Sequence, residues 1–289
     1  MSRRKAQELA GCFAPTAKAA ACRLSFAGLA CDSQSSYRRG SALGPRCIRR
    51  AYDADCYNST TETGVDLTGK VADLGDLRPL RAWKATAGKF RLLAESQFSS
   101  GKRAFFAGGD HAVTIPVARA LAVLGRRVHV VQFDAHPDLY DEFEGDRESH
   151  ACVAARILEM PHVASLTQIG IRTLNTPQET TARRFPDRLR MMAAREIPAG
   201  IPQLAHIPPS GAVYVTLDLD VFDPAFAPGV SHPVPSGLSP RVVMNFLQQA
   251  TWNLVGMDVV ELNPRRDDNQ HTAILAARLL LEAMGLASR

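Results

Sequence analysis

The sequence lacks any apolar stretch near the roughly twenty residues that span a bilayer. Its start is basic, but Pro15, Lys18 and Arg23 interrupt the following segment, so it lacks the hydrophobic core of a signal peptide. Its six cysteines contain no C-x-x-C pair, and a chain of 289 residues is too long to need disulfide staples. We therefore expect a cytoplasmic protein with free thiols and no membrane contact.

Basic residues are not concentrated in one place either. The formal net charge is +5, yet Lys and Arg are spread along the chain, and no basic run interleaves with aromatic residues. This distribution is evidence against a nucleic-acid partner. Nor does a fixed-period repeat or a low-complexity linker separate two halves. We expect a single domain over residues 1–289, with a flexible N-terminal segment at 1–25.

Short runs of β-branched and aromatic residues alternate with longer segments of helical period, in a chain with 46% hydrophobic residues. This alternation predicts an α/β fold of three layers, α/β/α, in which helices cover both faces of a mainly parallel sheet. The least periodic stretch, 57–76, is expected to form a surface excursion. The expected strands are 104–107, 128–133, 166–171, 212–217 and 255–260. The expected helices are 83–97, 115–124, 150–159, 240–250 and 272–283.

Three potential metal ligands follow the expected strand 128–133, namely Asp134, His136 and Asp138. Because side chains two residues apart in an extended chain lie on the same face, we expect the three to converge. Carboxylate and imidazole groups without thiolates favour a harder divalent ion such as Mn²⁺ over structural zinc. Taken alone, the same cluster is also compatible with a solvated turn.

Two further strands end in residues of the same kind. The expected strand 212–217 runs into Asp218 and Asp220, and the strand 104–107 leads through two glycines to His111. The glycines are expected to allow a tight turn of the backbone. In α/β sheets, ligands bind outside the carboxyl ends of the strands, so we expect all three clusters at one edge of the sheet.

Carboxylates crowded in this way repel one another unless cations lie among them. Six ligands exceed what one small ion usually takes from a protein, whereas two ions that share bridging carboxylates use them all. We therefore predict two metal ions, about 3.5–4 Å apart, that lower the pKa of a shared water molecule. Such a site is typical of a hydrolase, and metal analysis should find two divalent ions per active chain.

Several motifs, in the same order along the chain, resemble those of the ureohydrolases, the family of arginase and agmatinase. The resemblance covers nearly the whole chain beyond about residue 26. The motifs are Gly40-Ser41-Ala42-Leu43-Gly44-Pro45-Arg46, Gly108-Gly109-Asp110-His111, Asp134-Ala135-His136-Pro137-Asp138, Leu217-Asp218-Leu219-Asp220-Val221-Phe222-Asp223-Pro224, Ala227-Pro228-Gly229 and Val260-Glu261-Leu262-Asn263-Pro264.

The resemblance implies a metal role for six residues. Two carboxylates would bridge a pair of Mn²⁺ ions in each chain, and each ion would gain two further ligands. Metal-bound hydroxide would then attack the guanidinium carbon of a small cationic guanidino substrate and release urea. The bridging residues would be Asp134 and Asp218, the ligands of one ion His111 and Asp138, and those of the other His136 and Asp220.

The resemblance also implies catalytic roles for Glu261, His150 and the metal ligand Asp138. Glu261 would receive the guanidinium group, since a carboxylate holds a planar cation in fork geometry. His150 would shuttle a proton to the departing amine. The plainer alternatives are a salt-bridged glutamate after a strand and a helix-start histidine capped by Ser149. The family further suggests a homo-oligomer, a trimer or a hexamer.

One loop departs from the family. Where relatives commonly read Gly-Thr-Gly-Thr-Pro-Glu, this chain reads Val230-Ser231-His232-Pro233-Val234-Pro235. His232 is either an extra group of the substrate pocket or an exposed loop histidine. We favour the exposed position.

The substrate's far end is expected to meet loop 139–148, which carries five carboxylates and one arginine. An anionic loop attracts a cationic tail and repels a carboxylate, which favours agmatine, hydrolysed to putrescine and urea. The segment around Tyr140 and Ser149-His150-Ala151-Cys152 also resembles agmatinase-like members. A solvated acidic turn without substrate contact is the alternative. Arginine and guanidino acids such as guanidinobutyrate then remain open as substrates.

A hypothesis of a different class is a non-catalytic binding protein on the same scaffold. Such a relative would be expected to lose ligands. All six are present here, together with Glu261 and His150, which favours an enzyme.

Overall fold

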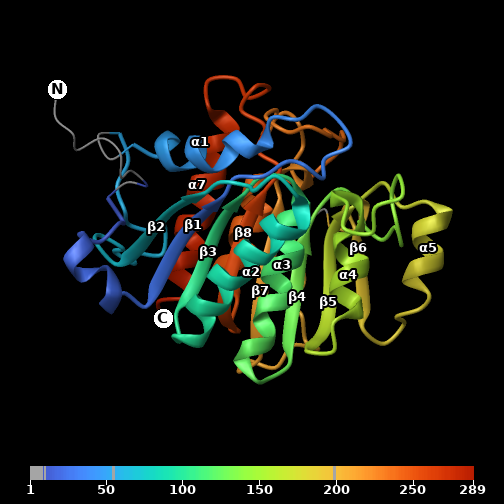
Figure 1. The fold of residues 1–289 in the computed structure, drawn as a ribbon, viewed down its shortest axis with the longest axis horizontal. Coiled ribbons are helices and arrows are strands. Elements are labelled where there is room, and N and C mark those ends of the chain that lie inside the picture. The colour runs from blue at the N-terminus through green and yellow to red at the C-terminus, as the bar shows by residue number, and fades with distance from the viewer. Residues whose placement is uncertain (1–8, 10, 54–55, 198–199) are drawn as a thin grey trace.

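A parallel β-sheet forms the centre of the structure, a computed structural model that describes residues 9, 11–53, 56–197 and 200–289 (Figure 1). Within these residues the sheet has eight strands in the order β2-β1-β3-β8-β7-β4-β5-β6, and neighbouring strands pair in parallel throughout. The predicted fold class is therefore confirmed. The strands are β1 (Leu24–Leu29), β2 (Val71–Leu77), β3 (Arg103–Gly108), β4 (Val128–Phe133), β5 (Val163–Ile171), β6 (Leu189–Ala193), β7 (Ala212–Asp218) and β8 (Asn253–Val260).

Helices cover both faces of the sheet (Figure 1). Helices α2, α3 and α4 pack side by side on one face, and α1, α6 and α7 on the other, while α5 lies near the β6 end. In the part of the chain that the structure describes, no helix is both long and apolar enough to cross a membrane. The helices are α1 (Gly44–Ala51), α2 (Trp83–Ser99), α3 (Thr114–Ala120), α4 (Val153–Glu159), α5 (Thr176–Ala182), α6 (Pro240–Gln249) and α7 (His271–Leu286).

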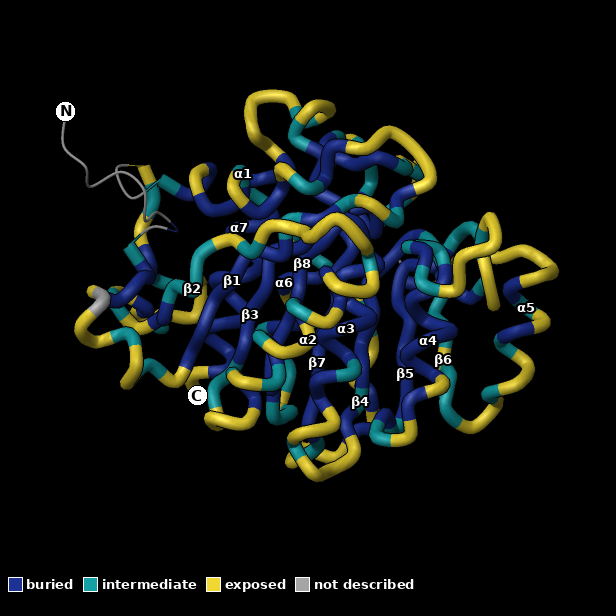
Figure 2. Tube along the Cα trace, in the orientation of Figure 1, coloured by how far each residue is buried: buried dark blue, intermediate teal, exposed yellow. Residues whose placement is uncertain are grey.

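Adjacent residues of one strand supply two separate cores. In β3, Phe105 packs with residues of α1, α6 and α7, whereas Phe106 packs with residues of α2 and α3. Successive side chains of a strand point to opposite faces, and both faces are covered here. Double burial explains why every residue of β7 is buried and why apolar side chains lie on both faces of this strand. Figure 2 shows the buried strands lying between helices whose outer sides are exposed.

Strand β2 contradicts part of the expectation for 57–76, because regular sheet structure begins at Val71. This edge strand is only partly buried, and its Asp73 and Asp76 each lie 2.7 Å from Arg49 of α1. Carboxylates paired with an arginine interrupt the apolar period by which a strand is recognised. The sequence pattern also missed β1, β6, α1 and α5, all of which are short.

The expected flexible segment 1–25 lies partly outside the described residues, at 1–8 and 10. In its described part, Cys12 and Phe13 are buried, and Phe13 forms a β-bridge with Val71. A 3₁₀ turn spans Thr16–Ala21, and β1 begins at Leu24.

Candidate metal centre

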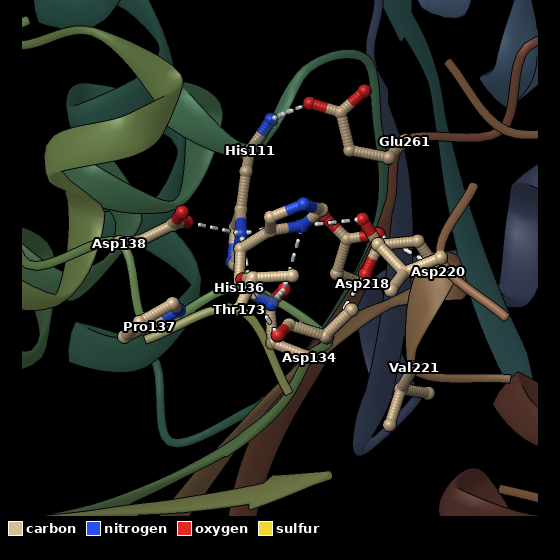
Figure 3. Close-up of polar contacts among 12 residues, drawn as sticks. His111, Asp134, His136, Pro137, Asp138, Thr173, Asp218, Asp220, Val221 and Glu261 are labelled. Carbon is tan, nitrogen blue, oxygen red and sulfur yellow. Dashed lines mark hydrogen bonds and ion pairs between the residues drawn. The ribbon is translucent and has the colours of Figure 1, made fainter. Parts of the chain in front are cut away.

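The residues of the candidate site lie at the ends of four neighbouring strands of the sheet. His111 follows β3, Asp134 follows β4, Asp218 ends β7, and Glu261 follows β8. Because β3, β8, β7 and β4 are consecutive in the sheet and parallel, their carboxyl ends lie side by side. Figure 3 shows the side chains pointing toward one another above this edge.

His111 faces three carboxylates at once. Its Nδ1 atom lies 2.9 Å from Asp138 Oδ2, 3.1 Å from Asp134 Oδ2 and 3.6 Å from Asp218 Oδ2. All four residues are buried. An imidazole nitrogen and several carboxylate oxygens therefore surround one small volume.

His136 forms a second group around the same central carboxylate. Its Nδ1 atom lies 2.8 Å from Asp220 Oδ2 and 3.7 Å from Asp134 Oδ1. Asp134 thus turns one oxygen toward His136 and the other toward His111. Two overlapping groups have ligand atoms close enough to hold a metal ion, namely His111, Asp134 and Asp218, and Asp134, His136 and Asp220.

Unsatisfied polar atoms indicate that this donor set fits cations. His111 Nδ1 and Asp138 Oδ2 are buried and close together, yet neither makes a hydrogen bond. Buried polar atoms in proteins almost always have a partner, so an orphaned pair calls for a missing one. Oxygen and imidazole ligands without a thiolate suit Mn²⁺ and similar divalent ions. The residues present therefore fit the implied metal pair.

The electrostatics of the cluster point the same way. Burial acts to lower the pKa of His136, but Asp220 and Asp134 outweigh it and raise this pKa to about 12. Burial raises the pKa of Asp218 well above its usual value, and the neighbouring Asp220 and Asp134 add to the rise. In the metal-free chain, bound protons therefore offset the negative charge of the carboxylates, which metal cations would otherwise offset.

Loop geometry, rather than strand alternation, brings the ligands together, so the predicted reason for convergence is wrong. Strand β4 ends at Phe133, before the first ligand, and Asp138 has a left-handed backbone with φ of 50°. Asp220 lies in the 3₁₀ turn Leu219–Val221, where its N–H donates to Asp218 Oδ1 at 2.9 Å. Strained φ values are typical of functional sites, and Glu261 has one too, at 65°.

The chain bends at Gly109 and Asp110, as the sequence suggested, but close packing, and not a left-handed backbone, requires the glycines there. Neither Gly108 nor Gly109 has a positive φ. A Cβ atom on Gly109 would instead collide with the carbonyl of Cys31, to which Asp110 N–H donates at 2.9 Å. The loop after β1 can therefore lie directly against the site.

A cavity of about 240 Å³ opens beside the cluster, a size that suits a small molecule. His150 and Glu261 both line it, with His150 Nδ1 lying 3.5 Å from Glu261 Oε1. Glu261 Oε1 also accepts the His111 N–H at 2.9 Å, whereas Oε2 is buried without a partner. His150 does begin a short 3₁₀ turn capped by Ser149, as the plainer alternative held, but its ring faces the cavity.

Burial acts to lower the pKa of His150, but Glu261 outweighs it and raises this pKa to about 8. In return, burial acts to raise the pKa of Glu261, and His150 lowers it overall. The pair is therefore ionised at neutral pH in the isolated chain.

Several residues that line the cavity were not predicted from the sequence. Ser36 Oγ lies 2.9 Å from His150 Nε2, and the Ser36 N–H lies 3.3 Å from the same nitrogen. Thr173 and Asn175 follow β5. A signal for Thr173 and Asn175 was present in the sequence, because a strand was predicted to end at Ile171 and ligands bind at the carboxyl ends of strands.

The exposed position favoured for His232 is wrong. Its ring centroid lies 5.0 Å from that of His150 and 6.1 Å from that of His136, and it lines the cavity. Burial lowers the pKa of His232. A histidine ring therefore forms part of the cavity wall in the loop that departs from the family's usual sequence.

The acidic loop does not present its carboxylates to the cavity. Asp141 Oδ1 lies 2.6 Å from Arg184 Nη1, and Glu148 lies 2.6 Å from Arg119. Tyr140 and Phe143 of this loop do line the cavity, but among the described lining residues none of the five loop acids appears. The loop therefore reaches the cavity through two aromatic side chains and not through its carboxylates, so the expected attraction of a cationic tail by this loop is not supported.

Fold and site together define a parallel α/β protein with two overlapping metal-binding groups at the carboxyl edge of its sheet. The sequence model of the Arginase family matches residues 22–285. The chain belongs to this family of hydrolases that act on guanidino C–N bonds.

Named relatives carry two different activities. A mitochondrial arginase of Medicago truncatula is 36% identical, with 92% of this chain and 82% of that protein covered. An agmatinase of Photorhabdus laumondii is 32% identical, with 90% and 85% covered. The structure of an agmatine ureohydrolase of Thermoplasma volcanium superposes with a TM-score of 0.84 at 28% identity, covering 98% of this chain and 94% of that one.

Proposed function

We propose that this chain hydrolyses the guanidinium group of a small cationic compound, releasing urea and an amine, with agmatine as the preferred substrate. The unpartnered Glu261 Oε2 in the cavity wall carries this proposal, because it is a free buried acceptor beside the two metal-binding groups. A planar guanidinium can donate two hydrogen bonds to such a carboxylate.

The proposed metal pair is two Mn²⁺ ions per chain. His111 and Asp138 would hold one ion and His136 and Asp220 the other, while Asp134 and Asp218 would contact both. When bound, such a pair acts as a Lewis acid and makes a water molecule nucleophilic near neutral pH. Of the proposed bridging residues, Asp134 already faces both imidazoles, at 3.1 and 3.7 Å.

The chain's own residues would orient the substrate and move one proton. Glu261 holds the guanidinium so that its carbon faces the metal cluster. Water oxygen adds to that carbon, the bond to the substituted nitrogen breaks, and His150 gives this nitrogen a proton so that it leaves as an amine. Of the two protons that the water oxygen loses on becoming the urea carbonyl, one restores the proton of His150 and the other completes the ammonium group of the amine. Ser36 and Glu261 hold the His150 ring from both of its nitrogens.

Agmatine is preferred in this proposal because the cavity wall offers no partner for a substrate carboxylate. Among the described residues that line it, there is no lysine or arginine, and the carboxylate that is not assigned to the metal pair is Glu261. A carboxylate on the substrate's tail would therefore find no permanently cationic side chain, whereas agmatine carries no carboxylate.

Arginine is the second candidate, favoured by the Tyr140–Asn175 pair. Asn175 Nδ2 donates to the Tyr140 hydroxyl at 2.6 Å, which leaves the Tyr140 proton free for an acceptor such as a substrate carboxylate. Similarity to a plant protein named arginase supports the same candidate.

Urea release from agmatine, arginine and guanidinobutyrate by the Mn²⁺-loaded protein tests the proposal. We expect kcat/KM for agmatine to exceed that for arginine by about tenfold or more. Tyr140→Phe is the matched variant, because it removes one hydroxyl and should leave agmatine turnover intact. Arginine as the better substrate, with its turnover lost in Tyr140→Phe, would overturn the agmatine assignment. No urea from any guanidine would favour the non-catalytic alternative.

The cytoplasmic location and the trimeric or hexameric assembly stay predictions. Light scattering on the purified protein would measure the assembly, and a monomer would contradict it.

A further inference from the structure

A buried chain of hydroxyl groups lies behind His111, on the side away from the cavity. His111 Nε2 lies 3.0 Å from Thr216 Oγ1, and Thr216 Oγ1 donates to Asp258 Oδ1 at 2.6 Å. The other oxygen of Asp258 accepts from Tyr214 at 2.7 Å and from Thr114 at 3.1 Å. All five residues are at most 1% exposed. Water therefore has no access to this chain.

Proton counting fixes the direction of each bond. Thr216 has one hydroxyl proton, and a carboxylate oxygen can only accept it. The Thr216 oxygen must then accept from His111 Nε2, which therefore carries a ring proton. Whenever His111 is neutral, its lone pair is on Nδ1, the buried atom that faces Asp134, Asp138 and Asp218 without a hydrogen bond.

We propose that Thr216 and Asp258 are positioning residues that hold His111 in the tautomer and orientation required to bind a divalent cation through Nδ1. The inference rests on the proposed metal centre and adds residues outside it. We call the hydrogen-bonded series His111–Thr216–Asp258 the relay. Thr216 and Asp258 lie on the adjacent strands β7 and β8, where they pair in register, so the sheet itself holds the relay in place. A rigid support of this kind reduces the freedom that the ligand loses when the ion binds.

His136 provides an internal comparison. Within the described residues, its Nε2 has no hydrogen-bond partner, and its side chain is 31% exposed, against 1% for His111. The relay therefore acts on one of the two metal-binding groups. Its loss should weaken one binding event more than the other.

Calorimetric titration of the metal-stripped protein with Mn²⁺ alone tests the proposal. Thr216→Val keeps the shape of the side chain but removes the hydroxyl, so one of two binding events should weaken by about 10- to 100-fold. The other should change by less than about threefold. Thr216→Ser restores the hydroxyl and should restore the affinity. Circular dichroism and thermal unfolding of the metal-free variants establish that each is folded.

Two further variants separate the relay from general loosening of the core. Tyr214→Phe removes a hydrogen bond to Asp258 but leaves the Thr216 bond, so its Mn²⁺ affinity should stay near that of the wild type. Thr216→Ala also removes the hydroxyl, so it should weaken binding as Thr216→Val does, and it carries the test if Thr216→Val does not fold.

Two results would overturn the relay. One is a folded Thr216→Val protein that binds two Mn²⁺ ions with wild-type affinity, and the other is equal weakening in Thr216→Val and Tyr214→Phe. A wild-type protein that binds fewer than two Mn²⁺ ions would instead contradict the metal centre, so the two failures are distinguishable.

Discussion

Ser36 Oγ lies 2.9 Å from Nε2 of His150, on the side of the ring opposite Glu261. The serine comes from the loop after β1, and the histidine from the segment before α4. The ring that is proposed to protonate the departing amine is therefore held by Ser36 and Glu261, two residues far from it in the sequence.

Ser36→Ala should lower kcat by about tenfold, because the ring loses one of its two anchors. KM should change little, since Ser36 is not proposed to bind the guanidinium. Steady-state kinetics measure both constants. Ser33→Ala on the same loop is the control, because the Ser33 hydroxyl contacts Cys31 and Gln34 and is absent from the cavity lining. An equal loss in both variants would contradict a role specific to Ser36.

Glu261→Gln should lower turnover roughly 1000-fold, because an amide donates where the guanidinium needs an acceptor. The remaining carbonyl oxygen can still accept the His111 N–H, so metal content should stay the same. Urea release and metal analysis on the same sample separate the two effects. Glu261→Ala should nearly abolish turnover as well. Surviving activity in either variant would rule out this role.

Stability of the metal-free protein should depend on pH through the His150–Glu261 pair. Burial opposes the charged ring, but Glu261 raises the pKa of His150 from 6.5 to about 8 in the folded chain. A raised folded pKa means that the stabilisation is complete below the unfolded pKa and is lost as pH rises through about 8. The shift corresponds to about 2 kcal/mol.

Urea unfolding of the wild type and of His150→Asn, at about pH 6 and about pH 9, measures this contribution. The difference in unfolding free energy between the two proteins should shrink by about 2 kcal/mol at the higher pH. Titrating groups remote from His150 are common to both proteins and cancel, whereas the buried Asp110 and Asp138 also respond to its charge and contribute to the difference. A difference that does not change with pH is the contrary result.

Neutralising the acidic loop should have little effect on agmatine turnover, because its carboxylates do not line the cavity. We expect the exposed pair Glu142→Gln and Glu144→Gln to keep kcat/KM within about twofold at physiological salt. A loss of more than about tenfold would restore direct recognition by this loop.

The sequence predicted the sheet where strands are apolar throughout and the site where ligands follow such strands. The strand expected at 128–133 is β4, and the six candidate ligands lie together. Edge strand β2 was not predicted because its carboxylates pair with Arg49, a contact between distant segments that interrupts the apolar pattern. Ser36 was not recognised as a site residue because it follows β1, which was not predicted. His232 was misplaced because nothing in its own segment shows that the loop folds over the cavity.

The proposed reaction requires two metal ions that work together. Titration of metal-stripped protein with Mn²⁺, while urea release from agmatine and arginine is followed, tests this in one measurement. We predict that activity rises until two equivalents per chain have been added and then stays constant. Full activity at one equivalent, or no urea at any Mn²⁺ concentration, would contradict the binuclear hydrolase.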